Sequence, residues 1–217
     1  MNYRDFDKYA LALESIPEAL ESSYSDMKKE PPLSDALEYS KIAINRLRAF
    51  YSSQAKIKSF LNKRLAQSGD TFFVETILFI LRLYCDIEGL QLEVASERAI
   101  APKRKTIRPD ISIWRKGNLL GAVECKTQLG YQRNDWHVQF GHREGKLQDA
   151  FPNSKLFLVV MTSGNWSGFG DDARVEEKFF CLLNNEWPAF IKEEFDESII
   201  LNPIERLLDQ IRILDTV

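Results

Sequence analysis

One stretch of the chain, residues 108–128, constrains the fold most, because it reads as two β-strands joined by a tight turn. Residues 111–114 alternate apolar and polar or aromatic side chains, and residues 115–118 (Arg-Lys-Gly-Asn) supply a turn signal. Residues 119–123 then form an apolar run, which is typical of a strand buried on both faces. The sequence therefore predicts a hairpin whose second strand lies inside a sheet.

Three charged side chains are predicted to meet at one edge of this hairpin. Glu124 and Lys126 are two residues apart on the second strand, so they share a face, while Cys125 points the opposite way. Asp110 opens the neighbouring strand. Two carboxylates and an ammonium are costly to bury without a purpose. The alternative is that Glu124 and Lys126 form a solvated surface pair of little energetic value.

This cluster suits metal-assisted hydrolysis of a phosphodiester. Mg²⁺ is usually held by one or two protein carboxylates together with waters and substrate phosphate. Such a metal acidifies a bound water and stabilises charge on phosphate oxygens. Lys126 would orient or deprotonate that water, or neutralise the transition state, and the sequence leaves these roles open.

Pro109-Asp110, followed on the next strand by Glu124-Cys125-Lys126, resembles the PD-(D/E)XK nuclease motif of restriction endonucleases and related DNA-cleaving enzymes. The resemblance implies a mixed sheet flanked by helices and DNA cleavage with Mg²⁺, for which Mn²⁺ can substitute. It implies that Asp110 and Glu124 are metal ligands, that the carbonyl of Cys125 is a further ligand, and that Lys126 is the catalytic lysine.

Many members of that family also place a glutamate on the helix before the first core strand. Glu75, within residues 72–78, matches this position and is the fourth candidate catalytic residue. The alternative is that Glu75 belongs to the polar stripe of its helix. The resemblance covers roughly residues 72–161.

Basic residues precede the first strand of the hairpin, although the formal net charge is −3. Residues 41–64 contain no acid, and a second basic group leads into Asp110. Neutralising phosphates supplies most non-specific affinity for DNA, so these stretches favour a DNA partner. Alternatively, they are a solvated helix face and a solvated loop. The candidate nucleic-acid contacts are Lys103, Arg104, Lys105, Arg108, Gln128 and Arg133.

Composition narrows the class of protein. The 217 residues are 44% hydrophobic and 28% charged, which is ordinary for a soluble globular chain. We expect a cytoplasmic protein, because three widely spaced cysteines indicate reduced core thiols and because there is no apolar run of membrane-spanning length and no signal-peptide core. His137 and His142 are five apart, so they do not share a helix face and no zinc site is predicted.

We predict an α/β fold with a mixed central β-sheet flanked by helices, comprising an N-terminal helical region (residues 1–70) and a nuclease core (residues 71–217). The parallel neighbour of the 119–126 strand is expected at residues 155–161, after a helix within 130–150. The other expected elements are helices at 5–22 (broken at Pro17), 35–65 and 71–85, a strand at 90–94, helical structure at 172–184 and a helix at 203–214.

The function that fits these features is a Mg²⁺-dependent endonuclease acting on DNA, of a restriction type or a related defence or repair type. Enzymes that cut both strands often act as C₂ dimers, so a homodimer is expected. One alternative is a catalytically inactive DNA-binding or interaction module on the same fold. Another is an unrelated interaction protein in which the motif arose by chance.

Overall fold

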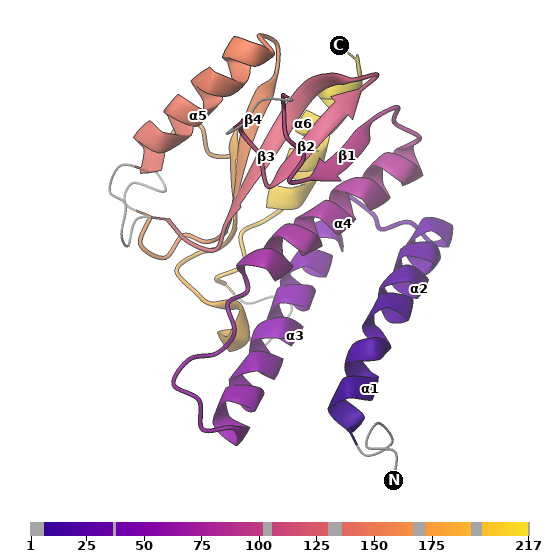
Figure 1. Ribbon diagram of the computed structural model, residues 1–217, viewed down its shortest axis with the longest axis vertical. Helices are drawn as coiled ribbons and strands as arrows, with labels where there is room; N and C mark the ends of the chain where they lie inside the picture. The colour runs from indigo at the N-terminus through magenta and orange to yellow at the C-terminus, as the bar shows by residue number, and fades with distance from the viewer. Residues whose placement is uncertain are drawn as a thin grey trace.

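A five-stranded mixed sheet forms the centre of the molecule (Figure 1). The computed structural model describes residues 7–36, 38–101, 106–129, 136–166, 172–191 and 197–216. The strands lie in chain order and are β1 (Glu93–Ser96), β2 (Ile111–Arg115), β3 (Asn118–Lys126), β4 (Lys155–Thr162) and β5 (Phe179–Leu183). The first three strands pair antiparallel, and β3, β4 and β5 pair parallel, which confirms the predicted α/β class.

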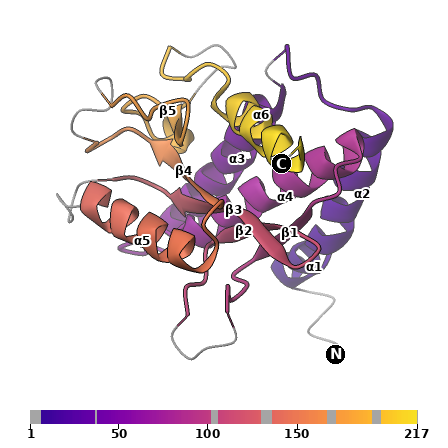
Figure 2. The same cartoon turned by 90° about the horizontal axis from the view of Figure 1, so that it is seen from above.

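Helices cover both faces of this sheet, but unequally (Figure 2). One face packs against α3, α4 and α6, and α2 packs in turn on α4, whereas the other face packs against α5. The helices of the described residues are α1 (Lys8–Glu14), α2 (Ile16–Lys29), α3 (Glu38–Phe60), α4 (Asp70–Glu88), α5 (Trp136–Ala150) and α6 (Pro203–Thr216), with a 3₁₀ turn η3 (Pro188–Phe190).

The predicted hairpin is confirmed as β2 and β3. Lys116 and Gly117 connect the two strands, and both have positive φ, at 48° and 84°. Two consecutive positive φ values match the strand twist of a two-residue hairpin, which is why a glycine stands here. The predicted parallel partner is also confirmed, since Glu124 of β3 lies opposite Leu158 of β4.

One predicted element was wrong, and another is present with shifted bounds. Residues 172–184 were expected to be helical, but Phe179–Leu183 form the buried strand β5 beside β4. A short, continuously apolar strand lacks alternation, so periodicity cannot separate it from a buried helix. The first strand was expected at residues 90–94 and lies at Glu93–Ser96, because Gly89 caps α4 in the left-handed conformation and the Leu90 amide donates to the Cys85 carbonyl.

The N-terminal helical part is present as predicted, with different helix ends. The break near Pro17 is confirmed, because α1 ends at Glu14 and Pro17 lies in the first turn of α2. Helix α3 is shorter than the predicted 35–65, and it contributes Leu47 to the same core as the sheet. The division of the chain at residue 70 stays a prediction.

The three cysteines are buried free thiols, as expected for core positions. Burial raises the pKa of Cys85 and of Cys181 to about 12, so both thiols stay protonated at neutral pH. Of the helices that the structure describes, none is both long and apolar enough to cross a lipid bilayer.

Candidate active site

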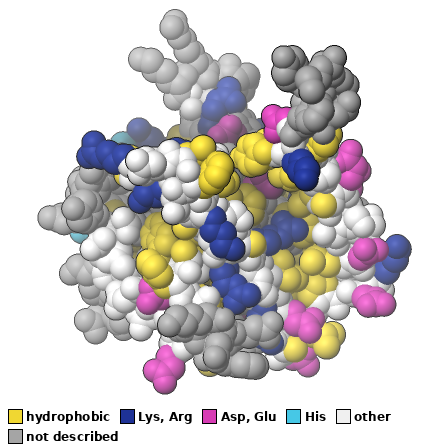
Figure 3. All heavy atoms as spheres, turned by 90° about the horizontal axis from the view of Figure 1, so that it is seen from below, with side chains coloured by type: hydrophobic (Ala, Val, Ile, Leu, Met, Phe, Trp, Pro, Cys, Tyr) yellow, Lys and Arg dark blue, Asp and Glu magenta, His cyan; other side chains and the backbone are white. Residues whose placement is uncertain are grey.

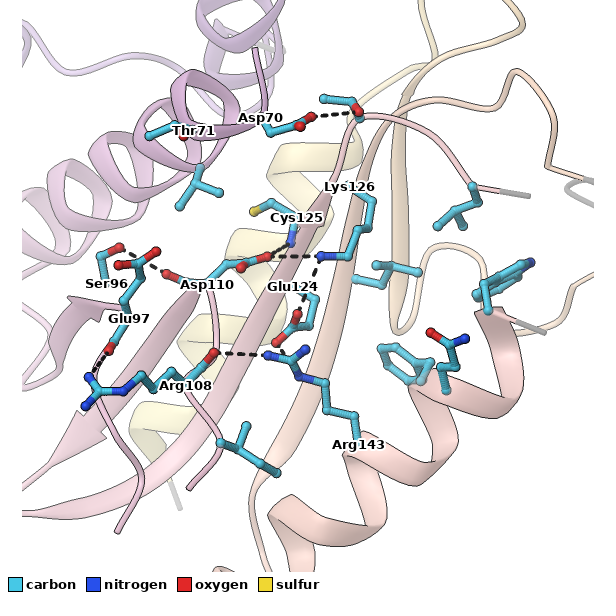
Figure 4. A pocket seen from close by; sticks show the side chains of 18 of the residues that line it. Asp70, Thr71, Ser96, Glu97, Arg108, Asp110, Glu124, Cys125, Lys126 and Arg143 are labelled. Atoms are coloured by element: carbon cyan, nitrogen blue, oxygen red, sulfur yellow. Dashed lines mark hydrogen bonds and ion pairs between the residues drawn. The ribbon is translucent and has the colours of Figure 1, made fainter. Parts of the chain in front are cut away.

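The three charged groups predicted to meet do lie together (Figure 4). Ile111 pairs with Val123, so Asp110, just before β2, falls beside the end of β3. An Asp110 Oδ2 atom accepts a hydrogen bond from the Cys125 amide at 2.8 Å. The Lys126 ammonium lies 3.5 Å from Asp110 Oδ2 and 3.7 Å from Glu124 Oε2. One ammonium therefore lies between two carboxylates contributed by neighbouring strands.

Strand alternation determines which side of the sheet carries this cluster. Val123 and Cys125 belong to the core beneath α3, α4 and α6. Ala122 belongs to the smaller core beneath α5. Glu124 and Lys126 lie two and four residues further along β3, so they face the same α5 side. The Cys125 thiol thus points away from the cluster, as predicted. The role of its carbonyl as a metal ligand stays a prediction.

Glu124 carries the strongest electrostatic perturbation of the cluster. Its side chain is only 4% exposed, and this burial raises the pKa of Glu124 to about 7, although the nearby Arg143 guanidinium opposes the shift. Repulsion from Asp110 raises the pKa further, and Lys126 lowers it. A positive charge placed beside a buried carboxyl group with a raised pKa stabilises its ionised form.

Arg143 on α5 completes the cluster, and the sequence analysis gave it no role. Its Nε atom lies 2.9 Å from Glu124 Oε1. The two atoms are close but not aligned as donor and acceptor, and neither has a hydrogen-bond partner within the described residues. Arg143 also donates to the Arg108 carbonyl at 3.0 Å. These contacts join α5 to β3 and to the segment entering β2.

The cluster lies in an open cavity of about 1390 Å³ between α4 and α5. Glu75 lines this cavity from α4 and is exposed. Among the described residues, no hydrogen bond or ion pair joins it to Asp110, Glu124 or Lys126. Two further acids that the sequence analysis did not single out also line the cavity. Asp70 accepts a hydrogen bond from Thr127 at 2.9 Å, and Glu97 follows β1 with a positive φ of 49°.

The candidate nucleic-acid contacts fall into two groups. Arg108 and Gln128 are exposed and line the cavity, where they were expected to lie near the substrate. The remaining four, Lys103, Arg104, Lys105 and Arg133, lie outside the described residues. Figure 3 shows a face on which Lys and Arg side chains gather toward the middle.

The donor set fits Mg²⁺ better than it fits zinc. Within the described ranges, no three His, Cys, Asp or Glu side chains lie close enough together to enclose a metal. Structural zinc sites need such enclosure, whereas Mg²⁺ keeps waters and needs only one or two protein carboxylates. Asp110 and Glu124 meet that need, and the buried Glu124 Oε1 atom has no aligned hydrogen-bond donor among the described residues.

Comparison with known proteins adds little to this geometry. No family model matches the chain, and no curated protein sequence matches it. One chain of a solved structure, described as the native BbvCI A2B2 tetramer at low resolution, is similar to this chain at 10% sequence identity and a TM-score of 0.33. The alignment covers 91% of this chain and 95% of that chain. A TM-score this low does not establish a shared fold, so the fold assignment rests on the strand order and the flanking helices.

Proposed function

We propose that this chain is a Mg²⁺-dependent endonuclease that hydrolyses phosphodiester bonds of DNA, of a restriction type or a related defence or repair type. The observation that carries the proposal is the position of the Lys126 ammonium, within 3.7 Å of carboxylate oxygens of both Asp110 and Glu124. Two carboxylates and a lysine that meet at neighbouring strand ends support the resemblance to the PD-(D/E)XK motif noted in the sequence.

Each residue has a distinct part in this proposal. Asp110 and Glu124 would hold the metal, together with the Cys125 carbonyl, and Glu75 supports the site from α4. A bound Mg²⁺, or Mn²⁺ in its place, would supply Lewis-acid stabilisation of phosphate charge and lower the pKa of a bound water. Lys126 is 44% exposed, so its ammonium reaches the cavity and can orient a water or donate to a phosphate oxygen.

The burial of Glu124 supports a role beyond surface charge. A solvated Glu and Lys pair would leave the carboxylate in water, with little effect on its pKa. Here the carboxylate is buried beneath Arg143, and the energetic cost of burial is offset when a cation neutralises it.

The proposed site also bears on the substrate and the assembly that we propose. The described part of each copy carries one such cluster, so cutting both strands of a duplex with that cluster requires two copies or two successive events. We propose a homodimer acting on duplex DNA. On the separate ground of its three buried free thiols, we propose that the protein is cytoplasmic.

The test is cleavage of supercoiled plasmid with Mg²⁺, and with EDTA in its place. We expect the native protein to nick or linearise plasmid only with Mg²⁺, and Lys126→Ala to reduce the rate about a hundredfold or more, as for loss of a catalytic proton-transfer group. Lys29→Ala is the matched control, because Lys29 is exposed on α2 and pairs with the exposed Asp26.

Equal inertness of the native protein and Lys126→Ala, with DNA binding intact, would favour the alternative of a catalytically inactive DNA-binding module. Equal cleavage by both proteins would instead remove Lys126 from the reaction. Either result contradicts the proposed role of the cluster.

A further inference from the structure

Helix α5 presents a polar stripe to the cavity. Its cavity-lining side chains include Gln139, His142, Arg143 and Lys146, which are spaced at i, i+3, i+4 and i+7 and therefore share one helix face. The buried residues Phe140 and Leu147 fix the helix to the sheet, and this orients the stripe. A polar stripe on a helix that is held against the sheet by buried side chains is a surface suited to recognition.

The opposite wall of the cavity has the opposite character. From α4, the cavity is lined by Asp70, Thr71, Val74, Glu75 and Leu78, which include two acids and no base. Figure 4 shows α4 and α5 on opposite sides of the Asp110, Glu124 and Lys126 cluster. A phosphate in the cavity would be repelled from the α4 wall and attracted to the α5 wall.

Two side chains of the stripe are available to a ligand. Lys146 and His142 are exposed, and within the described part of the chain neither has a hydrogen bond or an ion pair. Arg143 differs, because it contacts Glu124 and the Arg108 carbonyl. At Arg143 the stripe contacts the buried Glu124 carboxylate. One helical turn further along α5 it presents the exposed ammonium of Lys146.

The length of the stripe suits a short run of a nucleic-acid strand. Gln139 and Lys146 are seven residues apart, which is about 10 Å along a helix axis. Successive phosphates of one DNA strand rise about 3.4 Å along the duplex axis and also wind round it, so neighbouring phosphates lie roughly twice that far apart and the stripe spans about two of them.

We propose that the α5 stripe binds the phosphate backbone of the strand to be cut, with Lys146 and His142 contacting phosphates next to the one at Lys126. The inference rests on the proposed function and deepens it. In this proposal the α5 wall of the cavity contacts the DNA backbone. The acidic α4 wall, which carries Glu75, faces the metal.

The experiment measures binding of a short fluorescein-labelled DNA duplex by anisotropy in EDTA, where cleavage does not occur, over a series of salt concentrations. The logarithm of the affinity falls as the logarithm of the salt concentration rises, and each lost phosphate contact makes this fall shallower by about 0.9. The slope below means the steepness of this fall. We expect Lys146→Gln to lower the slope by about that amount and to weaken binding about threefold at low salt, and His142→Gln/Lys146→Gln to weaken it further. Lys29→Gln, on α2, is expected to bind like the native protein.

The outcomes separate this inference from the proposed function. If Lys146→Gln keeps the native slope and affinity while plasmid is cut, the inference fails and the nuclease stands. If the native protein cuts no plasmid but Lys146→Gln lowers the slope, the nuclease fails and the DNA-binding stripe stands. If the native protein binds no duplex, the inference is overturned.

Discussion

The two faces of the sheet differ in what they do. On one face α3, α4 and α6 enclose a continuous aromatic and aliphatic core with the interior side chains of β3 and β4. On the other face α5 packs through a smaller cluster that includes Phe140 and Leu147, and beside it the strand ends remain open to the cavity. The charged cluster lies on this second face.

Strand β3 contributes to both faces, because it supplies side chains to the large core and to the cavity. In β3, Val123 and Cys125 point into the large core, while Glu124 and Lys126 point to the cavity. The large core holds the strand rigidly, so the charged side chains start from fixed backbone positions. The energetic cost of burying Glu124 can be offset by the larger number of buried apolar side chains on the other face.

The largest effect is expected from comparing leucines on the two faces. Leu81→Ala removes a fully buried side chain of the large core and should lower the free energy of unfolding by about 3–5 kcal/mol. Leu147→Ala, on α5, should cost about 2–3 kcal/mol, because that smaller cluster borders the open cavity and can relax. Urea unfolding measures both values.

Amide hydrogen exchange sharpens this comparison. Leu147→Ala should increase exchange in α5 before it does so in α4, and it should weaken plasmid cleavage by displacing Arg143 and Lys146. A larger destabilisation by Leu147→Ala than by Leu81→Ala would contradict the division of roles between the faces.

The sequence predicted the parts of the site that local pattern controls. The turn at Lys116 and Gly117 and the alternation along β3 were enough to bring Asp110, Glu124 and Lys126 together. Strand β5 was missed because a uniformly apolar run carries no periodic signal. Arg143 was missed because its contact with Glu124 depends on how α5 packs on the sheet, and no spacing along the chain encodes that.

The second prediction concerns Glu124 in the metal-free protein. Its pKa is about 7 in the folded state against an ordinary 4.5, so the folded state holds the proton more tightly. The stability from this proton is complete below about pH 4.5 and is lost as the pH rises through about 7. Glu124→Gln does not titrate, so in EDTA its stability relative to the native protein should rise between about pH 5 and about pH 8, by up to roughly 3 kcal/mol.

Urea unfolding at the two pH values checks this, with Glu21→Gln on α2 as the control, because Glu21 is exposed. Arg143 keeps its hydrogen bond to the Arg108 carbonyl in this variant. Any cost at its buried Nε atom is the same at both pH values, so the predicted change with pH is unaffected. If the difference in the free energy of unfolding between Glu124→Gln and the native protein did not change with pH, the raised pKa of Glu124 would be contradicted.

Binding of Mn²⁺ by isothermal titration calorimetry, at a pH above the Glu124 pKa, tests most directly whether the strand-end carboxylates hold a divalent metal. The account predicts saturable binding to the native protein and to Asp26→Asn, whose altered carboxylate is exposed on α2. It predicts binding at least about tenfold weaker for Asp110→Asn, which removes a ligand charge. Equal Mn²⁺ affinity of Asp110→Asn and the native protein, or no binding to any of the three, would contradict it.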